Sequence, residues 1–327
     1  MIADIVVGLQ YGDEGKGKVT HQLARTGEYT HVLRFNGGCN AGHTIYHEGK
    51  KFVTHHVPAG VFYGIPSIIG PGCVINVENL FKEIDELEDA GLNVYDYLMI
   101  AENAHVITDF HLAEDKKDSK IGTTRTGNGP AYRDKYARRG VRAKEVKELS
   151  EFLIDVFEEL HIDNASTVLC EGAQGFGLDI DWGDYPYVTS SHCTVGGAVS
   201  CGIPFTSIRD VWGVAKAYET YVGAKKFEED NPVFESIREI GSEFGATTGR
   251  ARQVGWLDAN MLVRSAYING TTKIVFNKFD ILDKIETWHI KDGDQILEFG
   301  SSGDMEHWLS SLFPNMQVIF SRSPSEI

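Results

Sequence analysis

The chain has 327 residues, of which 42% are hydrophobic and 24% are charged. This composition is typical of a globular protein and excludes a disordered, fibrous or disulfide-stapled chain. The 31 basic and 47 acidic side chains leave a formal net charge of −16, which argues against nucleic acid or an anionic membrane as the main partner. An anionic ligand would therefore have to be held by local cations and backbone amides.

The cysteines and the N-terminal residues indicate a cytoplasmic protein. The cysteines are odd in number, widely spread and without a CxxC pair, so neither a disulfide framework nor a zinc cluster is predicted. They are Cys39, Cys73, Cys170, Cys193 and Cys201. The N-terminal residues lack a basic region and reach Gly8 after a short apolar run, which predicts a strand and neither a signal peptide nor a membrane span.

The predicted elements alternate between strands and helices along the chain. Ile2 to Val7 is a β-branched run that predicts a strand, and Gly15 to Ala24 has a composition compatible with a helix. A helix is also predicted from Val77 to Ala90, with Asn76 as its N-cap and Gly91 at its C′ position. Further helices are predicted at Lys144–Leu160 and Asp258–Ile268, and further strands at Leu98–Ile100, Thr167–Cys170, Val211–Val214 and Lys273–Phe276.

This alternation predicts an α/β fold, with a mostly parallel sheet that carries helices on both faces. We expect a single domain over residues 1–327. In such sheets ligands bind at the carboxyl ends of the strands, so the loops that follow the predicted strands are where chemistry is expected.

The loop after the first strand has the spacing of a phosphate-binding loop. Residues 12–19 read GDEGKGKV, which matches G-x-x-x-x-G-K but has Val19 where a P-loop has Ser or Thr. Valine cannot ligate Mg²⁺. A magnesium ion here would need another oxygen, and the Asp13 carboxylate is the nearest candidate.

A second motif, Asn277-Lys278-Phe279-Asp280, follows the strand predicted at 273–276. NKxD at the end of a strand is the arrangement with which GTP-binding proteins read guanine. The aspartate accepts from the N1–H and the 2-amino group, and the lysine stem covers the ring. Adenine offers neither donor, so the motif predicts a preference for GTP.

Six further segments lie between these two motifs. They read NAGHT (40–44), GTT (122–124), GPAY (129–132), EGAQG (171–175), YPYVTSS (185–191) and TTGRAR (247–252). This ordered set resembles the adenylosuccinate synthetase family over most of the chain. The resemblance implies a P-loop-like, GTP-binding ligase fold. It also implies an enzyme that couples GTP hydrolysis to joining L-aspartate onto C6 of a 6-oxopurine 5′-monophosphate through a 6-phosphoryl intermediate.

The resemblance assigns chemical roles to individual residues. Asp13 would remove the N1 proton, His43 would donate to the transferred phosphoryl group, and Gln174 would bond the 6-oxopurine edge. Mg²⁺ would be held by Asp13 and the Gly42 carbonyl. The phosphates and the guanine of GTP would be bound by Gly12, Glu14, Gly15, Lys16, Gly17, Lys278, Asp280, Ser301 and Gly303.

The two other substrates would bind in the same region. The residues matched to the purine monophosphate site are Asn40, Thr124, Arg138, Gln174 and Thr189. The residues matched to the aspartate site are Thr247, Thr248, Arg250 and Arg252, and paired arginine forks suit carboxylates. Arg138 would reach the nucleotide of a neighbouring subunit, which implies a homodimer. The alternative for Arg138 is a solvated basic helix face.

Departures from the family leave the nucleotide substrate open. The chain is shorter than typical bacterial members and resembles compact archaeal and bacteriophage forms. Residues 221–226 read YVGAKK, which differs from common members near the ribose, so a deoxyribose substrate stays possible. Phage relatives act on dGMP but commonly lack the aspartate that is present here as Asp13. IMP is therefore favoured over dGMP.

A regulatory GTPase is a different interpretation of the same two motifs. Asp210-Val211-Trp212-Gly213 offers a nominal DxxG. However, Val19 removes the magnesium hydroxyl, and the EGAQG, YPYVTSS and TTGRAR segments would have no task in a switch protein. The ligase is the favoured prediction.

Overall fold

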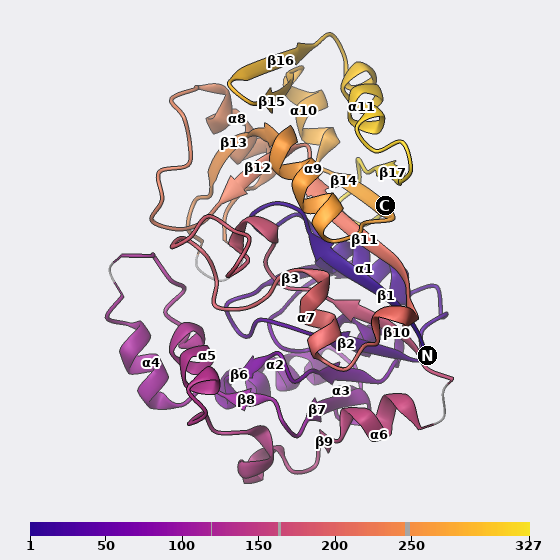
Figure 1. Cartoon of the computed structure of the whole chain (residues 1–327), viewed down its shortest axis with the longest axis vertical. Helices are drawn as coiled ribbons and strands as arrows, with labels where there is room; N and C mark the ends of the chain where they lie inside the picture. The colour runs from indigo at the N-terminus through magenta and orange to yellow at the C-terminus, as the bar shows by residue number, and fades with distance from the viewer. Residues whose placement is uncertain (119, 163–164, 246–248) are drawn as a thin grey trace.

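A nine-stranded sheet runs through the molecule (Figure 1). The computed structural model describes residues 1–118, 120–162, 165–245 and 249–327. The strand order is β17-β14-β11-β1-β10-β2-β5-β7-β9, and the neighbours pair in parallel. The strands are β1 (Ile2–Gly8), β2 (His31–Arg34), β5 (Ser67–Ile69), β7 (Leu98–Ala101), β9 (Leu153–Ile154), β10 (Thr167–Glu171), β11 (Ile208–Lys216), β14 (Lys273–Asn277) and β17 (Gln317–Phe320).

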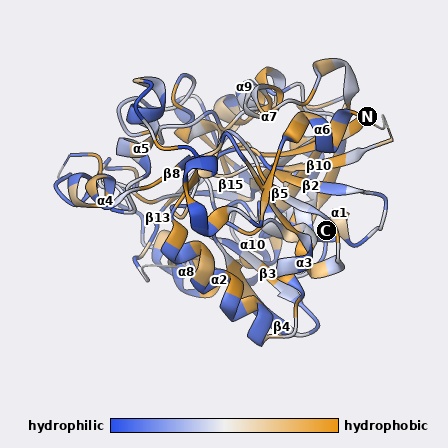
Figure 2. Ribbon diagram, turned by 90° about the horizontal axis from the view of Figure 1, so that it is seen from below, coloured by the Kyte–Doolittle hydropathy of each residue, from blue (hydrophilic) through white to orange (hydrophobic). Residues whose placement is uncertain are grey.

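Both faces of this sheet are buried, as the parallel arrangement requires. Ile5 and Val7 of β1 point into one apolar cluster with helix residues such as Leu80, whereas Val6 points into a second cluster with Val19. Figure 2 shows the strands around β2, β5 and β10 coloured as hydrophobic. The helices are α1 (Lys16–Ala24), α2 (Val77–Asp89), α3 (Val94–Tyr97), α4 (Asp109–Asp115), α5 (Asn128–Tyr136), α6 (Val156–His161), α7 (Val195–Ser200), α8 (Val233–Gly241), α9 (Ala259–Ile268), α10 (Phe279–Ile285) and α11 (Ser302–Ser311).

Smaller sheets flank the large one. Four strands pair in the order β12-β13-β15-β16, β3 pairs with β4, and β6 pairs with β8. Their bounds are β3 (His43–His47), β4 (Lys50–Thr54), β6 (Val74–Ile75), β8 (His105–Val106), β12 (Tyr218–Tyr221), β13 (Gln253–Asp258), β15 (Trp288–Asp292) and β16 (Gln295–Phe299). None of the helices in the described ranges is both long and apolar enough to cross a membrane.

Most predicted elements are confirmed, including their ends. Asn76 caps α2 by accepting from the N–H of Asn79 at 2.9 Å, and Gly91 follows the helix with a φ of +94°. Asp258 likewise caps α9. The five predicted strands correspond to β1, β7, β10, β11 and β14.

The helix predicted at Lys144–Leu160 is wrong. This stretch forms two short 3₁₀ turns, the edge strand β9 and then α6. Leu153 pairs with Ile100 of β7, and the Asp155 carboxylate accepts from the N–H of Phe157 at 2.7 Å to start α6. Strand pairing and a new N-cap therefore override the helical propensity of the segment.

The topology brings the loops that follow β1, β10 and β11 together at the carboxyl ends of the strands. β1 lies between β10 and β11, and the chain runs first to one side of β1 and later to the other. The carboxyl end of β1 is therefore a switch point, where open α/β sheets bind ligands.

Candidate active site

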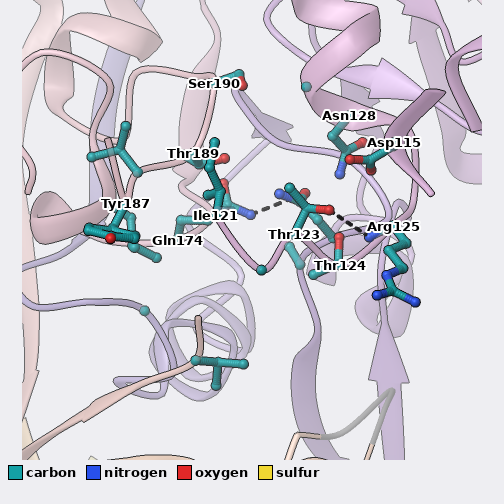
Figure 3. Close-up of a pocket in the computed structure, with 18 of the residues that line it drawn as sticks. Asp115, Ile121, Thr123, Thr124, Arg125, Asn128, Gln174, Tyr187, Thr189 and Ser190 are labelled. Atoms are coloured by element: carbon teal, nitrogen blue, oxygen red, sulfur yellow. Dashed lines mark hydrogen bonds between the residues drawn. The ribbon is translucent and has the colours of Figure 1, made fainter. Parts of the chain in front are cut away.

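A cavity of about 700 Å³ opens at the carboxyl ends of β1 and β10. Its size falls in the range of small-molecule sites. Figure 3 shows one side of it, where Gln174, Tyr187 and Thr189 face the loop that carries Thr123 to Arg125. The residues from the sequence prediction that line it are Gly12, Asp13, Lys16, Asn40, Gly42, His43, Thr124, Gln174, Thr189 and Arg250.

Glu14 holds the phosphate loop in shape from inside. Its fully buried carboxylate accepts from the N–H groups of Gln10 at 3.2 Å and Gly12 at 2.8 Å. It also pairs with the Lys16 ammonium at 2.6 Å. The loop therefore presents one anchored cation to the cavity, whereas the Glu14 side chain is used within the loop.

Strained backbone marks the ends of three strands. Asp13, Gln174 and Lys278 follow β1, β10 and β14, and each has a φ between 57° and 69°. Residues other than glycine rarely adopt this left-handed backbone conformation. It costs on the order of 1–3 kcal/mol, and such residues concentrate at functional sites. Gly15, with a φ of +95°, starts α1 beside them.

His43 is packed tightly between α1 and β10. A Cβ on Gly17 would lie 2.8 Å from the His43 Cβ, so only glycine allows this approach. The His43 Nδ1 is hydrogen-bonded to the Glu171 carboxylate. That carboxylate also accepts from Arg34 at 3.2 Å and from the N–H of Ala59 at 2.9 Å. Among the described residues nothing bonds the buried His43 Nε2.

Electrostatics fix the protonation of this pair. Burial and the nearby Arg34 charge lower the pKa of His43 to about 4. Burial alone would raise the pKa of Glu171, but His43 and Arg34 outweigh it and lower the pKa to about 2. The imidazole is therefore neutral near pH 7 and donates its Nδ1 proton to Glu171. An anion at Nε2 would favour uptake of a second proton, which Glu171 would stabilise.

Asp13 lies at one end of a buried chain of charges. The Arg252 Nε is 2.8 Å from an Asp13 carboxylate oxygen, and the Arg252 Nη1 donates to Glu243 at 2.5 Å. Glu243 also accepts from Lys216, at the end of β11, at 3.2 Å. Burial alone would raise the pKa of Glu243, but Lys216 and Arg252 lower it to about 2.

The two arginines of the TTGRAR loop thus have different surroundings. Arg252 is paired with two carboxylates of the chain itself and does not line the cavity, whereas Arg250 does. The Arg250 Nη2 donates to the Gly223 carbonyl at 3.3 Å. Thr247 and Thr248 lie outside the described residues.

Two of the expected purine-binding residues, Asn40 and Gln174, meet in the cavity, whereas Thr124 and Thr189 line it separately and Arg138 does not line it. The Gln174 Nε2 donates to the Asn40 Oδ1 at 3.3 Å, and Asn36 donates to the Gln174 Oε1 at 3.5 Å. The Thr124 hydroxyl bonds that of Thr126 at 2.7 Å. Hydroxyl and amide groups therefore line this part of the cavity, and their polar atoms are hydrogen-bonded to neighbouring side chains.

The expected guanine-reading residues lie apart from the cavity lining. The Lys278 Nζ donates to the Gly241 carbonyl at 2.8 Å, and Asp280 faces Lys284 at 3.4 Å. The Ser301 hydroxyl caps α11 by accepting from the N–H of Asp304, and Gly303 is in the first turn of that helix. The segment after β17 adjoins the NKxD motif, because the N–H of Ser321 donates to the Phe276 carbonyl at 2.8 Å.

Comparisons with known proteins match most of the chain. The family model described as adenylosuccinate synthetase matches residues 5–165 and 143–298. The chain belongs to the adenylosuccinate synthetase family. The adenylosuccinate synthetase of Chlorobium phaeobacteroides is 38% identical over 375 residues, covering 96% of this chain and 86% of the relative. That of Xylella fastidiosa is 40% identical, covering 86% and 78%.

Solved structures have the same fold. A fully ligated adenylosuccinate synthetase from Plasmodium falciparum superposes with a TM-score of 0.85 and 31% identity, covering 98% of this chain and 97% of that one. The succinoaminodeoxyadenylate synthetase of cyanophage S-2L, bound to dGMP and dATP, superposes with a TM-score of 0.78 and 22% identity over 99% and 93%. As a member of the family, this chain is a GTP-dependent carbon–nitrogen ligase of purine biosynthesis.

The switch interpretation is wrong on geometric grounds as well. Asp210 lies at the amino end of β11, where it pairs with Lys273 at 2.7 Å and accepts from Thr272 at 2.9 Å. The nominal DxxG therefore begins near the amino ends of the strands, whereas the phosphate loop follows the carboxyl end of β1.

Sequence reasoning missed the residues that support the site. Arg34, Lys216 and Glu243 had no predicted role, and Glu171 was noted only as part of EGAQG. Arg34 and Lys216 each end an apolar strand with a charge that becomes almost fully buried. A charged residue at the end of a buried strand is costly unless it is paired, and that is the signal that could have found them.

Proposed function

We propose that this chain makes adenylosuccinate from IMP and L-aspartate at the expense of GTP. The observation that carries this proposal is that Asp13, His43 and Gln174 line one cavity together with Lys16 and Arg250. A base, a phosphoryl-stabilising donor, a purine contact, a phosphate cation and a carboxylate anchor are what the two-step reaction needs.

The first step is phosphorylation of the purine O6. Asp13 takes the N1 proton of IMP, so that O6 gains electron density and attacks the γ-phosphorus of GTP. The new bond is O6–Pγ, and the bond that breaks joins Pγ to the β,γ-bridging oxygen, which leaves with GDP. Arg252 at 2.8 Å orients the Asp13 carboxylate for this role.

Charge on the transferred phosphoryl group is met by two residues. The Lys16 ammonium is fixed by Glu14 at 2.6 Å, so its position is set before the substrate binds. His43 donates from Nε2, which has no partner among the described residues, while Glu171 stabilises the positive imidazole. Such preorganised donors supply a large share of catalysis in phosphoryl transfer.

The second step replaces phosphate with the amine of aspartate. The amine forms the new C6–N bond and loses one proton, and the C6–O6 bond breaks with phosphate as the leaving group that takes up that proton. Arg250 binds a carboxylate of aspartate with its guanidinium fork, and Thr247 and Thr248 are proposed to complete that site.

Magnesium fits the donor set at the phosphate loop. Val19 is fully buried and offers no oxygen, but the Asp13 carboxylate and the Gly42 carbonyl belong to residues that line the cavity. The ligand atoms of Asp179, Asp181 and His192 lie within 4.8 Å of one another, close enough to share a metal ion. However, the Asp179 carboxylate already accepts hydrogen bonds from three backbone N–H groups. When bound, Mg²⁺ would neutralise charge on the phosphates of GTP.

The proposed assembly is a cytoplasmic homodimer. Arg138 is exposed just after α5 and does not line the cavity of its own chain, so contact with a nucleotide requires a second subunit. Tyr136, nearby, is 64% exposed, which suits a contact surface. All five cysteines are buried and free, which supports a reducing compartment.

A second candidate substrate is dGMP. Tyr221 and Val222 line the cavity where a ribose-facing arginine is usual in the family, and an apolar wall there suits a deoxyribose. The test is an activity panel of IMP, dIMP, GMP and dGMP with aspartate, read by the mass of the succinylated product.

We expect IMP with GTP to give the highest kcat/KM in that panel. Phosphate release should require both the purine nucleotide and aspartate. If kcat/KM is highest for dGMP, then dGMP and not IMP is the substrate. If kcat/KM for ATP equals that for GTP, the guanine-reading role of Asp280 is rejected.

A further inference from the structure

The two lysines of the GKGK loop have different surroundings. Lys16 lines the cavity, whereas Lys18 points from α1 to the segment of residues 321–327. Figures 1 and 2 both show the C-terminal end of the chain beside α1. The ammonium of Lys18 donates to the Ser321 Oγ at 2.7 Å and to the carbonyls of Ser323 and Glu326 at 2.9 Å each.

These three bonds use the full donor capacity of the side chain. A lysine ammonium has three N–H groups, and Lys18 is 8% exposed. No N–H of Lys18 is left for a phosphate oxygen while the 321–327 segment stays in place. Gln22, one turn further along α1, donates to the Ser325 carbonyl and docks the same segment.

The docked segment is joined to the NKxD motif. The N–H of Ser321 donates to the Phe276 carbonyl at 2.8 Å, directly before Asn277. The Phe320 ring stacks on Phe276 at 5.4 Å, and the Arg322 guanidinium lies 5.6 Å from the centre of the Phe279 ring. Burial lowers the pKa of the Lys18 ammonium to about 8. The Asp280 carboxylate is close enough to oppose part of this shift.

We propose that Lys18 is a positioning residue that shapes the guanine-binding end of the GTP site by docking residues 321–327, and that it does not bind phosphate. The proposal rests on the proposed function for the identity of the nucleotide. Its physical reason is that one buried cation gathers three acceptors from a segment that has no regular structure of its own, and thereby holds that segment beside Asp280.

The test compares GTP with ATP in Lys18→Met. We expect kcat/KM for GTP to fall about tenfold or more, since charge-assisted hydrogen bonds to the segment are lost. The value for ATP should change much less, because the loss lies in guanine recognition. The KM values for IMP and aspartate should stay unchanged. An equal loss for GTP and ATP would overturn the proposal, because a phosphate ligand acts on both nucleotides alike.

A double-mutant cycle gives a second criterion. Ser321→Ala removes one acceptor and is milder for folding than Lys18→Met. If Lys18 acts through the segment, the combined variant should resemble Lys18→Met alone. Additive losses would contradict the proposal. Lys273→Met is the matched control, since this half-buried lysine also makes a polar contact but lies at the end of β14 away from the NKxD motif. Its GTP to ATP ratio should equal that of the parent.

Hydrogen exchange separates this proposal from the proposed function. Amides of residues 321–327 should lose protection in Lys18→Met, whatever the enzyme turns over. Unchanged protection would overturn the docking role of Lys18. A parent protein without ligase activity, or without preference for GTP, would instead reject the proposed function, and the exchange result would still judge the docking.

Discussion

The two walls of the reaction cavity differ in how far the protein itself has built them. On the catalytic wall, His43, Glu171 and Glu14 are buried and bonded to one another or to the backbone. On the facing wall, Thr124 and Arg125 are exposed, and the Thr124 hydroxyl bonds within its own loop. One wall is fixed before any substrate binds, and the other offers groups that a ligand must order.

This difference predicts which kinetic constants each wall controls. A preorganised group is expected to act on the transition state, so its removal lowers kcat. A group that is exposed until the ligand binds is expected to act on binding, so its removal raises KM for one substrate. The predictions below test that division, from the largest expected effect to the smallest.

The largest effect is expected for Asp13→Ala, because this carboxylate is exposed to the cavity but is already held by Arg252 at 2.8 Å. The carboxylate would supply both the proton acceptor for N1 and an oxygen for the metal, and a positioned base alone is worth on the order of 10²–10⁴-fold. Turnover should fall by at least this factor, measured by product mass, while the melting temperature stays near that of the parent. A normally folded variant within tenfold of the parent would refute the assignment.

Glu171→Gln should lower kcat at least about 10- to 100-fold, the range for loss of a carboxylate that orients a metal-binding histidine. The amide keeps the shape but cannot stabilise a positive imidazole, so KM for GTP should change little. Glu83→Gln is the matched control. Glu83 is also a buried carboxylate that accepts from backbone N–H groups, and it lies outside the cavity. If both variants lose kcat equally, the effect is a loss of packing and not of His43 support.

Arg250→Lys tests a cavity residue that is exposed, as Thr124 and Arg125 of the facing wall are. Lysine keeps the charge but loses the bidentate fork, so the KM for aspartate should rise about tenfold while the KM for GTP stays constant. Steady-state kinetics with each substrate varied in turn will measure this. An unchanged aspartate KM, or equal losses for both substrates, would show that Arg250 does not hold the amino acid.

Arg138 tests whether the facing wall is completed by a second subunit. Arg138→Leu and Asp13→Ala should each be nearly inactive alone. Mixing them should restore activity toward about a quarter of the parent, because mixed dimers contain one site with both residues intact. If light scattering shows that the active enzyme is a monomer, the role of Arg138 across an interface is wrong.

The smallest effect concerns a buried carboxylate for which burial outweighs the nearby Lys291 and Lys225 charges. Burial and the nearby Asp258 raise the pKa of Glu219 to about 8, in contrast to the paired Glu171 and Glu243. Because the folded pKa exceeds the unfolded value, the stabilisation from the bound proton is fully present below about pH 4.5 and is lost as the pH rises through 8.

Glu219→Gln should remove this pH dependence. Its melting temperature should exceed that of the parent by a few degrees at pH 9 (about 2–4 °C per kcal/mol for a large domain) and by much less at pH 6. The exposed Glu151→Gln should show no such trend. A constant difference between pH 6 and pH 9 would contradict the raised pKa of Glu219.

Much of the architecture could be predicted from local sequence. The Asn76 cap, Gly91 and the apolar face between them specify α2 with little help from the rest of the chain, because caps and periodicity act within one or two turns. Ordered motifs likewise identified the family, since GDEGKGK and NKFD carry recognition within a few residues.

The tertiary structure alone decided which charges meet. His43 and Glu171 are 128 residues apart, Lys18 and Ser321 are 303 apart, and Glu14 is tied to Asn277 across 263. No local pattern encodes such pairs. They form because the parallel sheet brings the carboxyl ends of β1, β10 and β14 to one edge and buries charges that must then find partners.

The same reason explains the one helix that local reasoning placed wrongly. Residues 144–160 have helical composition, but an open edge of the sheet beside β7 takes Leu153 and Ile154 as a strand. The sequence by itself therefore determined the elements, their caps and the family. The sheet decided the edge strand, the partner of His43 and the direction in which Lys18 points, because those depend on backbone and charge pairing between distant parts of the chain.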